Sequence, residues 1–262
     1  MKGCLKMIVR MVSALLFLMF GLTSCTSGDD QIKAIRERGV LRVGVKVDVP
    51  RFGYMNPDTG RIEGMEVDLA HTIAKNIMRD ENAVKLVNVT AQTRGPMLDN
   101  GEIDIVIATF TITEERRKSF NFSRPYYTDE LGYLVSRSAS LKRPEDLNGK
   151  NVGVARAGTA KTAIEDECAR LGIDVTISEY SSYPEVKAAL AGGDVDAFVA
   201  DKSILYGYLD GDSALLDAGF NPQHYGIACT LKNDRLSAYI DSLLETWEKN
   251  GELAAIYGKW EI

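Results

Sequence analysis

The chain has little cysteine and histidine, which leaves few residues for metal or thiol chemistry. Its 262 residues include four cysteines and two histidines, His71 and His224. Only Cys168 and Cys229 follow residue 25, and their spacing matches no metal site. Two cysteines allow one disulfide, but no local pattern supports it, so we expect buried free thiols. No cofactor and no metal is implied.

Other absences exclude further classes of protein. The chain has no glycine-rich loop of the Walker type, so it does not bind nucleotides in that way. No segment after residue 24 is apolar for long enough to span a membrane. The formal net charge of -6 disfavours nucleic acid and anionic membrane surfaces as partners.

The first 24 residues have the pattern of a secretion signal. Lys2, Lys6 and Arg10 precede a short apolar stretch at residues 11–21. The following Leu22-Thr23-Ser24-Cys25 resembles a bacterial lipobox, which predicts a lipoprotein signal peptide over residues 1–24 and lipid on Cys25. The alternative is an ordinary secretory signal with an incidental cysteine. Cleavage removes three cations and changes the net charge from -6 to -9. Residues 25–30 would form a tether, and the protein would lie lipid-anchored in the cell envelope, outside the cytoplasmic membrane.

Two series of alternating strands and helices follow, which predicts the α/β class with two parallel-rich sheets. In the first series we expect strands at 41–45, 84–89 and 104–108, helices at 31–38 and 65–78, a helical turn at 93–100 and a loop at 49–61. In the second we expect strands at 131–136, 151–155, 175–179 and 195–200, with helices at 158–171, 184–191 and 203–208. A strand at 225–231 and helices near 236–247 and 253–260 complete the chain.

The central feature of the sequence is the segment from Asp104 to Arg116. An apolar strand ends at Ala108, and Thr113 has the position of an N-cap for a helix that contains Arg116. The carboxyl ends of strands in open α/β sheets are where ligands bind. A planar guanidinium beside threonine hydroxyls suits a carboxylate. The alternative is a structural corner with a surface arginine.

Several motifs resemble family 3 of the bacterial extracellular solute-binding proteins, the amino-acid receptors of ABC importers. The matching segments are Gly64-Met65-Glu66-Val67-Asp68-Leu69, residues 111–116, residues 122–127, Gly158-Thr159, Asp196-Ala197-Phe198 with Asp201, and Tyr225-Gly226-Ile227-Ala228. Further segments resemble the branch that binds aspartate and glutamate, namely residues 43–50, Thr93-Arg94-Gly95-Pro96 and Ala108-Thr109-Phe110-Thr111.

The resemblance implies a two-lobed periplasmic-binding-protein fold of type II, with two sheets joined by two hinge strands. Lobe 1 would comprise residues 31–132 plus 229–262, and lobe 2 would comprise residues 136–224. The hinges would lie near residues 133–135 and 225–228. Ligand would contact both lobes and shift the protein toward a closed form.

The resemblance also implies roles for single residues. Arg116 would hold the α-carboxylate of an amino acid with the help of Thr111, the Thr109–Thr111 backbone and the N–H of Thr159. Asp201 would pair with the α-ammonium. Thr159 and Asp201 could instead be plain N-caps, and Phe110 could line the pocket or only pack in the core. Glu66 and Asp68 would serve the start of their helix.

Lys46 and Arg94 would select the ligand. Both follow strands, so both should face the crevice and hold a side-chain carboxylate. The alternative is that each is a solvated surface cation. The implied function is a monomeric receptor for L-aspartate or L-glutamate, served by a membrane permease and its separate ATPase. The alternatives are a receptor for another polar amino acid such as glutamine, a dehydratase-like enzyme, and an envelope sensor; no nucleophile or general base is required.

Overall fold

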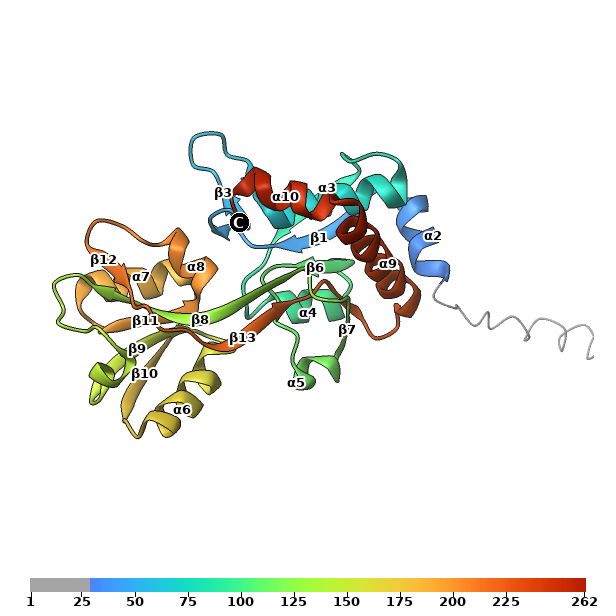
Figure 1. Ribbon diagram of the computed structural model, residues 1–262. Helices are drawn as coiled ribbons and strands as arrows, with labels where there is room; N and C mark the ends of the chain where they lie inside the picture. Colours follow the sequence, from blue (N-terminus) through green and yellow to red (C-terminus); the bar gives the residue numbers. More distant parts are fainter. Residues whose placement is uncertain (1–28) are drawn as a thin grey trace, which may run out of the picture.

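The computed structural model describes residues 29–262, which form two lobes (Figure 1). The expected signal peptide and Cys25 lie outside the described residues. Helix α2 (Asp29–Arg38) includes the last two residues of the expected tether. Within residues 29–262, no helix combines the length and the apolar composition needed to cross a membrane.

The first lobe is built on a five-stranded sheet covered by helices. Its strand order is β5 (Val84–Asn88), β1 (Leu41–Val45), β6 (Ile105–Ile107), β14 (Ala228–Thr230) and β7 (Phe120–Phe122). The first three strands are parallel, and β14 runs antiparallel to its neighbours. The helices of this lobe after α2 are α3 (Met65–Met78), α4 (Arg94–Asp99), α5 (Glu114–Arg117), α9 (Asp234–Asn250) and α10 (Glu252–Trp260).

Helical periodicity explains how this lobe packs. Leu69, Ile73 and Ile77 recur at helical spacing on α3, and all are buried. Leu236, Ile240 and further apolar residues give α9 a similar buried face. These faces share an apolar core with β1 and with Ile105 and Ile107 of β6, and this core continues into lobe 2. Val106, Phe120 and Ala228 of the same sheet belong to a separate apolar cluster.

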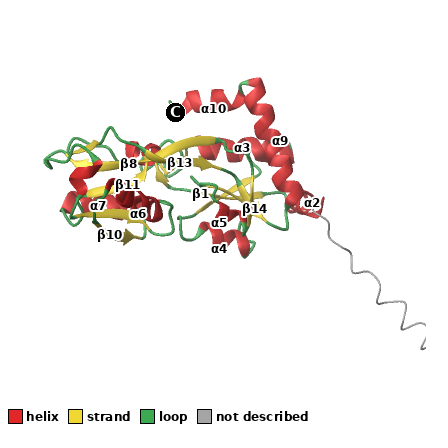
Figure 2. Cartoon of the chain, turned by 60° about the horizontal axis from the view of Figure 1, so that its bottom comes forward, coloured by secondary structure: helices red, strands yellow, loops and turns green. Residues whose placement is uncertain are grey.

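The second lobe is built on a six-stranded sheet. Its strand order is β10 (Val175–Tyr180), β9 (Lys150–Ala155), β11 (Ala197–Asp201), β8 (Tyr127–Ser136) and β12 (Ser213–Leu215), with β13 (Phe220–Tyr225) also pairing with β8. Its helices are η1 (Pro144–Leu147), α6 (Ala160–Leu171), α7 (Tyr183–Gly192) and α8 (Lys202–Gly207). The view in Figure 2 also separates the two lobes, with α6, α7, β10 and β11 of lobe 2 on one side and α2, α9 and α10 of lobe 1 on the other.

The chain passes between the two sheets twice, at residues 123–126 and 226–227. Next to these passages β8 and β13 pair in antiparallel fashion, and they run together toward lobe 1 in Figure 1. Residues 133–135, where the sequence suggested the first hinge, lie inside β8 and pair with β11 in the second sheet. We therefore propose hinges at residues 123–126 and 226–227, with lobe 1 ending near residue 122.

Several short strands differ from the expectation. The segment expected as a loop contains most of a small sheet of β2 (Asp48–Val49), β3 (Gly53–Met55) and β4 (Ile62–Glu63). Gly53 is required there because a Cβ at this position would lie 2.5 Å from the backbone oxygen of Lys46. Strands β7 and β12 were not expected, and the expected strand at 225–231 is divided between β13 and β14.

The two cysteines of the described chain lie in different lobes. Cys168 is on α6 and Cys229 is on β14. Both are buried and free, which confirms the expectation of unpaired thiols. Burial raises the pKa of the Cys229 thiol, so this group stays protonated and behaves as an apolar residue.

Candidate functional site

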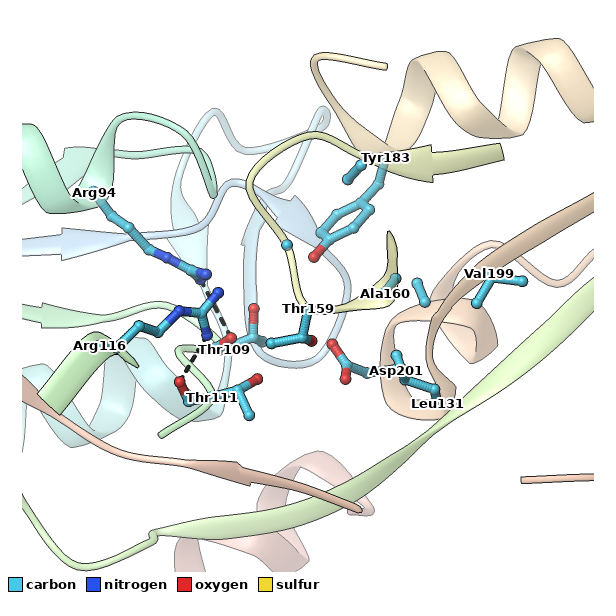
Figure 3. A pocket seen from close by; sticks show the side chains of 13 residues that line it. Arg94, Thr109, Thr111, Arg116, Leu131, Thr159, Ala160, Tyr183, Val199 and Asp201 are labelled. Atoms are coloured by element: carbon cyan, nitrogen blue, oxygen red, sulfur yellow. Dashed lines mark hydrogen bonds between the residues drawn. The ribbon is translucent and has the colours of Figure 1, made fainter. Parts of the chain in front are cut away.

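A pocket lies between the two lobes and is lined by residues of both (Figure 3). It encloses about 320 Å³ not filled by protein atoms, including its opening to solvent. Six of the eight expected binding residues line it: Arg94, Thr109, Thr111, Arg116, Thr159 and Asp201.

The lobe 1 side of the pocket is a sharp corner after β6. Thr109 has a φ of 44°, a conformation that non-glycine residues adopt rarely. Its backbone N–H donates to Glu66 Oε1 at 2.5 Å, and the Tyr126 hydroxyl donates to the same oxygen. The buried Glu66 carboxyl group therefore holds the corner in place.

Helix α5 positions Arg116. The Thr113 hydroxyl accepts from the backbone N–H of Arg116 at 3.1 Å, which confirms Thr113 as the N-cap. The guanidinium donates from Nη1 to the Thr111 carbonyl at 2.7 Å and from Nη2 to the Ala157 carbonyl of lobe 2 at 3.4 Å. Burial and the nearby charge of Arg94 lower the pKa of Arg116 to about 9.

Arg94 is a buried cation without a carboxylate partner. It is 3% exposed, and its Nη1 donates to the carbonyl of Ala108 at 2.6 Å. Its Nε has no hydrogen-bond partner, and the described chain contains no ion pair of Arg94. Desolvation lowers the pKa of Arg94. A buried charge is costly unless it is paired, so this site favours an anion.

The Phe110 ring supports both guanidinium groups. The Arg94 Cζ lies 4.0 Å from the ring centroid, and the Arg116 Cζ lies 4.8 Å from it. Such contacts stabilise a cation over an aromatic face. Phe110 does not line the pocket, and its ring packs with Phe120 and Phe122 in the core.

Asp201 comes from lobe 2, at the end of β11. Its side chain makes no capping bond to α8, and its Oδ1 is buried with no partner among the described residues. The N-cap alternative therefore does not account for this carboxyl group. Burial, together with the charge of Asp129, raises the pKa of Asp201 to about 7.

Lys46 is buried but does not line the pocket. Its Nζ lies 2.9 Å from Asp48 Oδ1 and 4.7 Å from the centroid of the Tyr183 ring. Strand β2 places Asp48 beside Lys46, so the charge of Lys46 is neutralised within the chain. The sequence predicted two cations, Lys46 and Arg94, that would need a carboxylate of the ligand. In the structure only Arg94 lacks a carboxylate partner among the described residues.

Sequence reasoning missed three contributors to the site. Tyr183 lines the pocket from α7, and Glu66 holds Thr109 from α3. Gln223 accepts hydrogen bonds from the hydroxyls of Thr111 and Thr159. Glu66 lies in an acidic motif that could have identified it, whereas a single glutamine in a polar segment gives no signal.

Comparison with known proteins shows the relationship of this chain. Residues 41–261 match the family described as bacterial extracellular solute-binding proteins, family 3. The chain is 38% identical to the glutamine-binding protein of Geobacillus stearothermophilus, over 78% of each protein. It is 29% identical to the glutamate-binding protein GluB of Corynebacterium glutamicum, over 88% of this chain and 82% of the relative.

Solved structures agree with this relationship. An ancestral arginine-binding protein bound to glutamine is 33% identical, with a TM-score of 0.76 over 85% of this chain and 98% of that one. The fold is thus that of the type II periplasmic binding proteins. The names of these relatives differ in ligand, so the fold alone does not select one.

Proposed function

Because the chain belongs to family 3 of the bacterial extracellular solute-binding proteins, we propose that it is an amino-acid receptor of an ABC importer whose ligand is L-glutamate or L-aspartate. The relatives named above are binding proteins for amino acids. The preference for an acidic ligand rests on the charges of the pocket.

The observation that carries this proposal is the imbalance of charge in the pocket. Its lining contains two cations, Arg94 and Arg116, and one anion, Asp201. Three buried polar atoms of its lining lack partners among residues 29–262: Arg94 Nε, Thr109 Oγ1 and Asp201 Oδ1. Buried polar atoms without partners are rare in proteins, and a ligand group in the pocket would supply partners for these three.

An acidic amino acid satisfies these groups. Arg116 holds the α-carboxylate, and Asp201 holds the α-ammonium. Arg94 then remains for a second carboxylate, with the Thr109 hydroxyl as a further donor. A glutamine side chain would bring no negative charge to Arg94, and the missing charge-assisted hydrogen bond would cost roughly 1 to 3 kcal/mol or more.

Transport would follow from closure of the lobes. A ligand that contacts Arg116 in lobe 1 and Asp201 in lobe 2 binds the closed form better than the open form. A membrane permease with a separate ATPase would then recognise the closed receptor. We assign no catalytic residue, because binding and closure need none.

Glutamine is the second candidate ligand. The relative that is 38% identical is named a glutamine-binding protein. The pairing of Lys46 with Asp48 also removes one of the two cations that pointed to an acidic ligand. The choice between the two ligands therefore depends on Arg94.

The proposal is tested by replacing Arg94. The variant Arg94→Ala should bind L-glutamate about tenfold or more weakly, because a loss of 1.4 kcal/mol in binding free energy raises the Kd tenfold. Its affinity for L-glutamine should fall less, so that the preference for glutamate shrinks. The control Arg117→Ala removes an equal charge from an exposed position of α5 and should change neither affinity. An unchanged glutamate preference in Arg94→Ala would refute the proposal.

A further inference from the structure

Gln223 links two threonines of the pocket lining that come from different lobes. Its Oε1 accepts a hydrogen bond from the hydroxyl of Thr111 and another from that of Thr159, each at 2.8 Å. Gln223 is 1% exposed and lies on β13, next to the passage between the lobes. The side chain is thus buried behind the two hydroxyls and is not itself part of the pocket lining.

The orientation of the Gln223 carboxamide follows from its third contact. Its Nε2 donates to the carbonyl oxygen of Asn221 at 2.9 Å. The reversed orientation would place Oε1 against that carbonyl, so two acceptors would face each other. The carboxamide oxygen therefore faces the two threonines, and both hydroxyls are the donors.

This arrangement commits both hydroxyl protons. A threonine hydroxyl has one proton to donate and can also accept hydrogen bonds. Once Thr111 and Thr159 donate to Gln223, they offer only lone pairs to a group inside the pocket. The Thr109 hydroxyl differs, because it has no partner in the described chain and is free to donate.

We propose that Gln223 is a positioning residue that makes the Thr111 and Thr159 hydroxyls acceptors for the α-ammonium of the ligand. This inference rests on the proposed amino-acid receptor function. An ammonium group has three N–H donors, and Asp201, Thr111 and Thr159 together supply three acceptors. The α-carboxylate then depends on Arg116 and on donors other than these two hydroxyls, which revises the role expected for Thr111.

The same contacts couple recognition to closure. Thr111 follows β6 in lobe 1, and Thr159 precedes α6 in lobe 2. One oxygen atom of Gln223 can accept from both only when the lobes are together. The complete set of acceptors for the ammonium group therefore forms in the closed state.

The test compares a ligand with its analogue that lacks the ammonium group. Calorimetry would give the affinities of the full chain for L-glutamate and for glutarate. The variant Gln223→Leu frees both hydroxyl protons, so binding of L-glutamate should weaken by about tenfold, as expected for the loss of two neutral hydrogen bonds. Binding of glutarate should change less. The control His224→Leu alters the adjacent, exposed residue of β13 and should leave both affinities unchanged.

A second variant separates this effect from misfolding. Thr159→Val removes one of the two hydroxyls, keeps the size of the side chain and should also reduce the preference for L-glutamate over glutarate. Combined with Gln223→Leu, it should have little additional effect, since both act on one network. An unchanged preference in both folded single variants would overturn the role of Gln223 while leaving the receptor function intact. Failure of the wild type to bind L-glutamate would overturn both.

Discussion

At the residue scale, the recognition that we propose depends on buried charges that the described chain does not pair. Lys46 illustrates the contrast, since Asp48 lies 2.9 Å from its ammonium group. Arg94 has no such partner, and Asp201 Oδ1 accepts no hydrogen bond from the described chain. A ligand with complementary charges compensates for the desolvation of these groups.

Arg116 and Asp201 are expected to act as general anchors. Removing one partner of a buried charge pair costs about 2 to 5 kcal/mol. Arg116→Ala and Asp201→Ala should therefore reduce the affinities for L-glutamate and L-glutamine by similar factors, as measured by calorimetry. Arg117→Ala serves again as the control for the loss of one cation. Wild-type affinity in either variant would remove that residue from the site.

Glu66 should make stability depend on pH. Burial raises the pKa of its carboxyl group from the ordinary value of 4.5 to about 7, despite the bonds from Tyr126 and Thr109 and the charges of Lys46 and Arg94. Between these values the folded chain keeps a proton that the unfolded chain releases, so stability falls as pH rises, by at most about 1.4 kcal/mol per pH unit.

The variant Glu66→Gln isolates this contribution. Glutamine has the shape of the protonated acid and does not titrate. Denaturant unfolding from pH 4.5 to 8 should show a smaller loss of stability in Glu66→Gln than in the wild type. Asp201, whose pKa is also raised to about 7, contributes in both proteins and cancels in the difference. Parallel stability curves would show that Glu66 keeps its ordinary pKa.

The residues of the site differ in how visible they are in the sequence. Arg116 could be predicted because Thr113 marks a helix start in the segment that follows an apolar strand. The pairing of Lys46 could not, since it depends on how β2 folds back. Gln223 acts through a contact with Thr111, which lies 112 residues away in the sequence.

At the scale of elements, α8 of lobe 2 lies against the loop after β2 in lobe 1. The Tyr208 hydroxyl donates to the Asp48 carbonyl across this contact. A Cβ at Gly207 would lie 2.7 Å from Cδ of Pro50, which leaves no room for a side chain. Gly207 thus permits the lobes to meet.

Gly207→Ala should therefore hinder closure. Crowding of this kind costs about 1 to 3 kcal/mol. The affinity for every ligand should fall by a similar factor, because no ligand group is touched. Gly211→Ala is the matched control, since a Cβ there meets nothing within 4 Å. A change in ligand preference, or no change in affinity, would argue against this contact as part of closure.

Long periodic elements could be predicted from sequence, and short ones could not. Helix α3 matches its expected bounds, because its apolar residues recur over 14 positions. Strands β2 and β4 have two residues each, too few to show any period. Strand β8 begins at Tyr127, four residues before the expected start, and polar residues such as Asp129 hide its first half.

At the scale of the whole molecule, the receptor must stay near its permease. We expect Cys25 to carry a lipid anchor, as the Leu22–Cys25 sequence indicates. Cys25→Ser should release the protein from the membrane fraction or leave its precursor uncleaved. Cys168→Ser is the control, since this buried thiol in lobe 2 has no part in anchoring. Normal, detergent-dependent attachment of Cys25→Ser would refute the anchor.

The central claim is that the unpaired Arg94 makes this receptor specific for an acidic amino acid. The most direct test is calorimetry of the wild-type protein with L-glutamate, L-aspartate, L-glutamine and L-asparagine in one buffer. The acidic ligands should bind at least about tenfold more tightly than the amides, since 1.4 kcal/mol corresponds to one decade. Equal affinity for L-glutamate and L-glutamine, or tighter binding of L-glutamine, would contradict it.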